Sequence, residues 1–318
     1  MYPKKTNKEI IIIGGGPGGI TAAIQLKRSR LEPLLLERRE LGGLLWNANL
    51  VENYPGFPNG VTGEKLIRLM RKQIERIGVN MAHEEVVKVD WEGERFKITT
   101  KHATRTTDFL IIASGTKSKP LPDVISPEAR DRVFTEVWPL LKEEGKRIVV
   151  IGAGDAAFDY ALNLSKKRNI VTILNRGETV KCLGLLFERA SSEARIRYRA
   201  GVAVSRITLD ETATSLQVRC EANGERDTPS TSLRTSIPLH ADYVLFAVGR
   251  VPNRDFLSEE IRQREQELIE AGRLYFVGDV KNESFRQVAI AAGDGLRAAM
   301  QIYFSVGRDN ISRYKDVK

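Results

Sequence analysis

The feature that most constrains this chain is a glycine-rich motif that occurs twice in the same setting. Residues 14–19 (GGGPGG) follow the β-branched run Ile10–Ile13, and residues 152–157 (GAGDAA) follow the apolar run Arg147–Ile151. Each motif opens a segment with helical spacing, so each predicts a strand, a tight turn and a helix. A single motif of this kind is a weak signal, and its glycines could simply make turns. Two copies in register indicate a duplicated fold.

The repeat extends beyond the glycines. Glu37 lies 23 residues after Gly14, and Asn175 lies 23 residues after Gly152, each at the end of a second apolar strand. Residues 108–115 (DFLIIASG) and 242–249 (DYVLFAVG) then share one template: an acid, an apolar strand, a small residue and a glycine. The sequence therefore predicts two dinucleotide-binding folds.

Composition shifts indicate where the domains meet. Residues 116–123, rich in Lys and Pro, and residues 249–253 (GRVPN) are expected linkers. A short strand at 274–279 and an Ala-rich helix at 286–304 are too small to stand alone, so we expect them to complete the first domain. The predicted fold class is α/β, with two Rossmann-like three-layer dinucleotide-binding domains, the second inserted into the first. The predicted domains are residues 1–117 with 249–318 and residues 118–248.

The overall composition excludes several other classes. The 318 residues are 42% hydrophobic and 29% charged, which rules out a collagenous or wholly disordered chain. No apolar stretch approaches the roughly 18 residues of a membrane span. The net charge of +9 comes from dispersed Lys and Arg without an RNA-binding aromatic motif, so no nucleic acid partner is expected. Two cysteines cannot form a zinc cluster, so we expect no metal and a reducing, cytoplasmic compartment.

The two motifs predict what each cleft binds. The first glycine permits the turn, the second lets the backbone approach a pyrophosphate, and the third position allows close packing of helix on strand. Glu37 is placed to accept hydrogen bonds from ribose hydroxyls, which suits FAD or NAD. In the second cleft Asn175, Arg176 and Lys181 present no carboxylate against a 2′-phosphate, so NADPH fits better than NADH. The alternative is that Arg176 and Lys181 are solvated loop cations.

Further segments give the chain a specific resemblance. It resembles the low-molecular-weight thioredoxin reductase family over almost its whole length. The matching segments are residues 14–19, 42–43, 51–57 (VENYPGF), 113–115, 152–157, 249–253, 278–279, 286–288 and 293–295. The resemblance implies FAD in the first domain, NADPH (with NADH possible) in the second, and a homodimer.

The resemblance also implies roles for particular residues. Asn53 would lie by the flavin ring, Asp279 would hold the ribitol, and residues 286–288 would close over the isoalloxazine edge. The expected cofactor-binding residues of the first domain are Gly14, Gly16, Pro17, Gly18, Gly19, Glu37, Gly42, Gly43, Leu44, Asn53, Val87, Ala113, Gly115, Gly278, Asp279, Arg286, Gln287 and Val288. Those of the second domain and its following linker are Gly152, Gly154, Asp155, Ala156, Asn175, Arg176, Lys181, Gly249 and Arg250. No protein side chain is expected to be catalytic.

The departure from the family concerns sulfur. In that family a CxxC precedes the second glycine motif, and counting back from Gly152 without gaps brings residues 135–138 (TEVW) to its place. Cys182 and Cys220 have no neighbouring thiol in the sequence and are expected to be packing residues. A disulfide substrate needs an attacking thiolate, so thioredoxin reduction is not expected.

The chain is similar in this respect to the thioredoxin-reductase-like ferredoxin or flavodoxin reductases, although residues 305–318 are a short polar stub where those proteins carry a longer tail. The expected function is an FAD-dependent NAD(P)H oxidoreductase whose flavin passes electrons directly to ferredoxin or flavodoxin. The net positive charge is what an acidic electron carrier would require of its partner. It is equally what an ordinary basic protein with solvated surface charges would have. Two alternatives stay open: a reductase or oxidase acting on O₂, a quinone or another small molecule, and a flavin-binding sensor that does not turn over.

Overall fold

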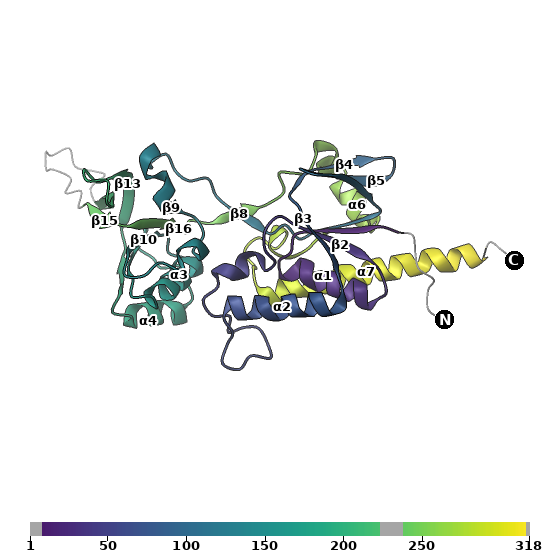
Figure 1. Cartoon of the computed structure of the whole chain (residues 1–318), viewed down its shortest axis with the longest axis horizontal. Helices are drawn as coiled ribbons and strands as arrows, with labels where there is room; N and C mark the ends of the chain where they lie inside the picture. Colours follow the sequence, from purple (N-terminus) through teal and green to yellow (C-terminus); the bar gives the residue numbers. More distant parts are fainter. Residues whose placement is uncertain (1–7, 223–237, 316–318) are drawn as a thin grey trace. The chain divides into compact units, whose positions relative to one another are not determined.

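The computed structural model describes residues 8–222 and 238–315, which form two compact units (Figure 1). Unit 1 comprises Met1–Trp46, Val51–Lys117 and Val251–Lys318. Unit 2 comprises Ser118–Arg250 together with the short segment Asn47–Leu50. Unit 2 is thus inserted into unit 1, which confirms the predicted fold class.

Unit 1 is built on a parallel sheet with the strand order β18-β7-β1-β2-β3. Its strands are β1 (Ile10–Ile13), β2 (Pro33–Glu37), β3 (Asn80–His83), β7 (Phe109–Ile112) and β18 (Leu274–Phe276). Every side chain of β1 and β7 is buried, because both faces of the sheet are covered. This explains why these strands are continuous apolar runs. The C-terminal strand β18 pairs with β7, so the chain returns to complete the first sheet.

Two further layers enclose this sheet (Figure 1). Helix α1 packs against both α2 and α7 on one side, while an antiparallel sheet covers the other. The helices are α1 (Pro17–Arg28), α2 (Gly63–Ile77), α5 (Glu259–Gln263), α6 (Glu265–Glu270) and α7 (Val288–Lys315), with short 3₁₀ turns η1 (Gly43–Asn47) and η4 (Gly278–Val280). The antiparallel strands are β4 (Val86–Glu92), β5 (Arg95–Thr100) and β6 (Thr104–Thr107).

Helix α7 continues past the predicted end at residue 304. It begins at Val288 and ends at Lys315, so the expected polar stub is largely helical. The second glycine of the 293–295 match has a packing role, because a Cβ on Gly295 would lie 2.1 Å from the carbonyl oxygen of Gly18 in α1. Close approach of α1 and α7 therefore depends on this glycine.

Unit 2 has the same arrangement of a parallel sheet and an antiparallel sheet. Its parallel sheet has the order β12-β11-β10-β16-β9, and its antiparallel sheet has the order β13-β14-β15. The parallel strands are β9 (Val133–Phe134), β10 (Arg147–Ile151), β11 (Ile170–Leu174), β12 (Ile196–Arg199) and β16 (Tyr243–Phe246). The remaining elements are β13 (Val202–Leu209), β14 (Leu216–Ala222), β15 (Leu239–Ala241), α3 (Asp155–Ser165), α4 (Gly184–Ser192), η2 (Pro127–Arg132) and η3 (Trp138–Leu140).

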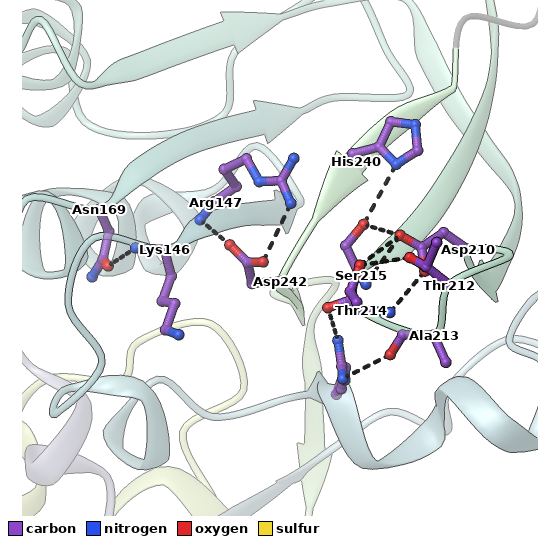
Figure 2. Close-up of polar contacts among 11 residues, drawn as sticks. Lys146, Arg147, Asn169, Asp210, Thr212, Ala213, Thr214, Ser215, His240 and Asp242 are labelled. Atoms are coloured by element: carbon purple, nitrogen blue, oxygen red, sulfur yellow. Dashed lines mark hydrogen bonds and ion pairs between the residues drawn. The ribbon is translucent and has the colours of Figure 1, made fainter.

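The acid that begins each late strand has the same role in both units. The carboxylate of Asp108 accepts the backbone N–H of Glu9 at 2.9 Å, at the start of β1. In unit 2 the carboxylate of Asp242 accepts the backbone N–H of Arg147 at 2.7 Å, at the start of β10 (Figure 2). Each acid thus ties the beginning of the central strand to its neighbour, which accounts for the matching positions in the two templates.

The connections at the two ends of Ser118–Arg250 pair with each other. They form the short strands β8 (Thr116–Ser118) and β17 (Arg250–Pro252). The N–H of Lys119 donates to the carbonyl of Gly249 at 3.3 Å, and the N–H of Asn253 donates to the carbonyl of Gly115 at 3.0 Å. Within the described ranges, no helix has the length and apolarity needed to cross a bilayer.

Candidate cofactor sites and the position of the missing dithiol

The first glycine of each motif is enclosed by its own unit. A Cβ on Gly14 would lie 2.3 Å from the carbonyl oxygen of Ala113, and a Cβ on Gly152 would lie 2.4 Å from that of Ala247. Both glycines also have positive φ, +107° and +145°. A side chain at either position would collide with the backbone of the adjacent strand end, so glycine is required there.

The third residue of each motif, Gly16 or Gly154, has open space around it instead. A Cβ on Gly16 or on Gly154 would meet no protein atom within 4 Å. Gly16 precedes α1 and Gly154 precedes α3, so the N-terminus of a helix is directed at each open position. Bare backbone beside a helix N-terminus fits the pyrophosphate of a dinucleotide. Both units pass this test, with Pro17, Gly18 and Gly19 in α1, and Asp155 and Ala156 in α3.

In unit 1 the Glu37 carboxylate lies at the glycine motif. Its two oxygens accept the N–H of Gly15 at 2.6 Å and the N–H of Arg39 at 2.8 Å. The N–H of Gly42 donates to the carbonyl of Gly15 at 2.8 Å, so the 42–43 segment is held against the same turn. Leu44 follows in η1, while Ala113 and Gly115 follow β7. Sequence positions far apart therefore converge on one edge of the parallel sheet.

The residues expected beside the flavin ring also include a contacting pair. The Nδ2 of Asn53 donates to the Oε1 of Gln287 at 2.8 Å, across 234 residues of sequence. Gly278 is held by its N–H to the carboxylate of Asp294 at 3.1 Å, which fixes the turn that carries Asp279. Arg286 and Val288 lie where α7 begins. Val87, in β4, has an exposed side chain.

In unit 2 the segment after β11 folds back onto the glycine motif. The N–H of Lys181 donates to the carbonyl of Ala153 at 2.9 Å, and Lys181 forms an isolated bridge with Gly154. Two residues later the N–H of Leu183 donates to the carboxylate of Asp155 at 2.8 Å. Lys181 is therefore held beside the open glycine position, with its side chain exposed.

The Asn175 side chain supports this loop from inside. It is buried, and its Nδ2 donates to the carbonyl of Thr179 and the hydroxyl of Tyr198, at 3.0 and 2.9 Å. Its Oδ1 accepts the N–H of Gly177 at 3.0 Å. All three contacts are within the protein, so Asn175 shapes the loop while the exposed Arg176 faces solvent.

Glu136, one of the residues that the gap-free count sets against the family's CxxC, forms an ion pair with Arg250. The Oε1 of Glu136 accepts from the guanidinium of Arg250 at 2.6 Å, and these side chains are only 21% and 17% exposed. The Ser118 hydroxyl lies 3.4 Å from the same oxygen. The other oxygen of Glu136 accepts from the side-chain amide of Asn47. The carboxylate thus joins β8, β17 and the Asn47–Leu50 segment of unit 2.

A second asparagine holds the same segment to α3. The N–H of Asn49 donates to the carboxylate of Asp159 at 2.9 Å, and the ammonium of Lys166 donates to the Asn49 side chain. Burial raises the pKa of the Asp159 carboxyl to about 6. Neither Glu136 nor Asp159 was predicted from the sequence. The gap-free count pointed to residue 136, but its partners lie 89 and 114 residues away in the chain.

The two cysteines are free and have the properties of packing residues. Cys220 is buried in β14, and burial raises the pKa of its thiol. Cys182 is partly exposed, and burial together with the negative charge of Asp155 raises the pKa of its thiol. A raised pKa disfavours the thiolate, which is the nucleophilic form. Neither thiol is activated for disulfide exchange.

A polar cluster in unit 2 contains Asp, Ser and His but lacks the geometry of a hydrolytic triad (Figure 2). The Ser215 hydroxyl donates to the carboxylate of Asp210 at 2.7 Å, whereas the Nδ1 of His240 lies 3.5 Å from that hydroxyl. In a triad the acid orients the histidine. Here Asp210 instead accepts from backbone and side chains of its own turn, including Thr214. This cluster shapes the loop between β13 and β14.

The fold and the paired glycine cradles define a class of proteins: oxidoreductases with two dinucleotide folds, one inserted into the other. The family model for pyridine nucleotide-disulphide oxidoreductases matches residues 8–295. The chain belongs to this family.

Among its curated relatives is a thioredoxin reductase of Chlamydia trachomatis, 30% identical over 93% of this chain and 97% of that protein. A thioredoxin reductase of Chlamydia pneumoniae is 31% identical, over 92% and 97%. A crystal structure of Lactococcus lactis thioredoxin reductase superposes with a TM-score of 0.80 at 28% identity, covering 95% of this chain and all of that one. Thioredoxin reductases of this family bind FAD and use NADPH, and the chain is an oxidoreductase of this type.

Proposed function

We propose that this chain is an FAD-dependent NADPH oxidoreductase that passes electrons from its flavin directly to ferredoxin or flavodoxin, without a redox-active dithiol. The observation that carries the proposal is the ion pair of Glu136 with Arg250, because the gap-free count sets residue 136 within the family's CxxC. A carboxylate paired with a guanidinium cannot exchange with a disulfide, because that reaction requires a sulfur nucleophile.

The residues of each unit would divide the cofactors between them. Unit 1 would hold FAD, with its pyrophosphate on the backbone at Gly16, its ribose at Glu37, and its ring near Asn53 and Gln287. Unit 2 would hold NADPH on the backbone at Gly154, and Arg176 and Lys181 are the residues expected to contact the 2′-phosphate. When bound, FAD accepts a hydride from nicotinamide and can release the electrons one at a time.

The cysteines support a route without sulfur. Cys182 and Cys220 both have raised thiol pKa values, and both are unpaired. The relatives named above are called thioredoxin reductases, and thioredoxin is therefore the acceptor against which the proposal must be tested. The net charge of +9 supports an acidic protein carrier, which it would attract at low ionic strength. Homodimerisation and a cytoplasmic location stay predictions.

The test has two stages. Purified FAD-loaded protein is first mixed anaerobically with NADPH and with NADH while flavin absorbance is recorded. Rapid bleaching is expected, and bleaching slower than minutes would favour a flavin-binding sensor. Steady-state turnover is then compared with ferredoxin, flavodoxin, menadione, O₂ and thioredoxin. We expect ferredoxin or flavodoxin to give the highest kcat/KM.

The matched control removes both thiols. The double variant C182S/C220A should retain the turnover of the wild type with every acceptor, because no thiol takes part. Thioredoxin reduction that disappears in this variant would overturn the proposal. Turnover confined to menadione or O₂ would reassign the protein as a small-molecule reductase or oxidase.

A further inference from the structure

The edge strand of the second parallel sheet ends beside the loop that carries Arg176. Strand β12 pairs with β11 in parallel, with Leu174 opposite Arg199. The N–H of Asn175 donates to the carbonyl of Arg199 at 2.9 Å, so these two backbones are adjacent where both strands end. Carboxyl ends of parallel strands form the edge at which such folds bind dinucleotides. Arg199 therefore lies at the ligand-binding edge, one strand away from Arg176.

Further hydrogen bonds fix this arrangement. The N–H of Gly201 donates to the carbonyl of Gly177 at 3.1 Å, and the N–H of Val202 donates to the carbonyl of Asn175 at 2.9 Å. The loop after β11 is thus attached to the turn after β12 along several residues. The exposed side chains of Arg176 and Arg199 extend from one rigid backbone frame.

The charges at this edge favour an anion. Arg176, Lys181 and Arg199 are all exposed, whereas residue 177 is a glycine and supplies no charge. One acid also lies at this edge: the Oε1 of Glu178 would be 2.4 Å from a Cβ on Gly201, so three cations stand against one carboxylate. Arg199 forms no ion pair with any acid in the described part of the chain, and its charge acts on the thiol of Cys220.

We propose that Arg199 binds the 2′-phosphate of NADPH together with Arg176 and Lys181, and so determines the preference for NADPH over NADH. This rests on the proposed function only in taking a pyridine nucleotide as the ligand of unit 2. A phosphate monoester accepts charge-assisted hydrogen bonds from guanidinium groups in a forked geometry, which suits two arginines at the carboxyl ends of neighbouring strands.

The chain offers a matched control two residues earlier. Arg197 is exposed and lies on the same face of β12 as Arg199, because side chains alternate along a strand. It pairs with Thr172, so it is roughly 6–7 Å further from the carboxyl edge. A general effect of positive charge would act through both arginines, whereas a phosphate contact should involve Arg199 alone.

The experiment measures binding of adenosine 2′,5′-bisphosphate and of adenosine 5′-monophosphate to the full FAD-loaded chain by isothermal titration calorimetry. Loss of one charge-assisted contact in R199A should weaken the bisphosphate about ten- to a hundredfold. The monophosphate should bind R199A as it binds the wild type, R197A should match the wild type with both ligands, and R199K should retain part of the affinity.

Three results would overturn the proposal: wild-type affinity for the bisphosphate in R199A, an equal loss in R197A, or an equal loss for the monophosphate. This assay records nucleotide binding without electron transfer. It therefore tests the role of Arg199 even if neither ferredoxin nor flavodoxin is the electron acceptor. Flavin that NADPH fails to reduce would refute the proposed function and leave the binding result in force.

Discussion

At the scale of single residues, buried charge in unit 2 is organised around two acids. Glu136 has a guanidinium partner, whereas the buried carboxyl of Asp159 accepts a backbone N–H from Asn49. Desolvation disfavours the charged form of such a group, which is why the pKa of Asp159 rises from 3.8 to about 6. The ionised carboxylate at neutral pH is therefore a cost to the folded state.

The first prediction follows from the sign of this shift. A folded-state pKa above the unfolded value means that the stability contribution is complete below pH 4 and is lost as pH rises through about 6. The variant D159N keeps an acceptor for the Asn49 N–H but has no charge. It should be more stable than the wild type at pH 7.5, by up to about 3 kcal/mol.

The measurement is urea unfolding of both proteins at pH 4 and at pH 7.5. The advantage of D159N should shrink to a small fraction of its pH 7.5 value at pH 4, where the wild-type carboxyl is protonated in the folded state and partly protonated in the unfolded state. A D159N variant that is less stable than the wild type at pH 7.5 would show that Asp159 contributes through its charge.

At the scale of elements, different glycines of each motif serve folding and ligand binding. Gly152 is enclosed by the backbone of Ala247, and Gly154 is open. G152A should fold poorly or melt at least about 5 °C lower, because a Cβ at 2.4 Å forces the turn apart. G154A should melt as the wild type does, yet lose most NADPH binding, because its methyl group fills the space of the pyrophosphate.

Differential scanning fluorimetry and NADPH titration of both variants test this pair. The same contrast is expected for G14A and G16A with FAD content as the second measurement. Equal melting losses in G152A and G154A would contradict the assignment of the open position to a ligand.

One ion pair fastens the antiparallel sheet of unit 1 to the segment that precedes it. Arg105 in β6 donates to both oxygens of Glu84 at 2.7 and 2.6 Å, and with the Thr100 hydroxyl it lowers the pKa of Glu84 to about 2. This stabilisation is present above pH 4.5 and is lost as pH falls through about 2. E84Q should lower the melting temperature at pH 7 by about 2–4 °C, or about 1 kcal/mol after solvent screening.

Melting curves at pH 7 and pH 3 provide the check, with E85Q as the control. Glu85 also pairs with basic side chains, Arg38 and Lys101, but it is more exposed. The difference between wild type and E84Q should narrow at pH 3. A constant difference would mean that the amide substitution acts through packing.

The sequence predicted the central elements well because their signals are local. Strands β1 and β10 have the predicted bounds, since four or five buried residues in a row directly precede each glycine motif. The antiparallel sheets were not predicted. Their strands are half exposed, and register shifts near Lys88 and Arg206 interrupt the alternation that identifies a strand.

The site residues also divide into those that local motifs predict and those that only the folded chain reveals. Glycine motifs, Glu37 and Arg176 were predicted because motif spacing alone places them. The partners of Glu136 were not, because Asn47 and Arg250 approach it only after the chain has folded. Arg199 carries no motif, and only the pairing of β11 with β12 reveals its position.

At the scale of the whole molecule, unit 2 has its two ends side by side. Lys119 and Gly249 are hydrogen-bonded through their backbones where unit 2 begins and ends. An inserted unit of this kind has its own apolar cores, one on each face of its parallel sheet. Such domains can fold independently of their hosts.

We therefore expect a fragment of residues 118–250 to fold. It should unfold cooperatively in a thermal melt and bind adenosine 2′,5′-bisphosphate within about tenfold of the full chain, because it lacks only the Asn47–Leu50 segment of its unit. Circular dichroism and calorimetry measure both properties. A fragment without a cooperative transition would show that unit 2 requires its host.

The hydrogen bonds of Asp108 and Asp242 have a consequence for how such a molecule can diversify. Each carboxylate holds the start of the central strand and contacts none of the glycines expected to bind a cofactor. Its role therefore does not depend on which dinucleotide its unit binds. In each unit this hydrogen bond lies at the end of the sheet opposite the ligand-binding edge. Substitutions of a few residues at that edge can therefore change which coenzyme the unit binds without loosening the sheet. The common framework would persist through each such exchange.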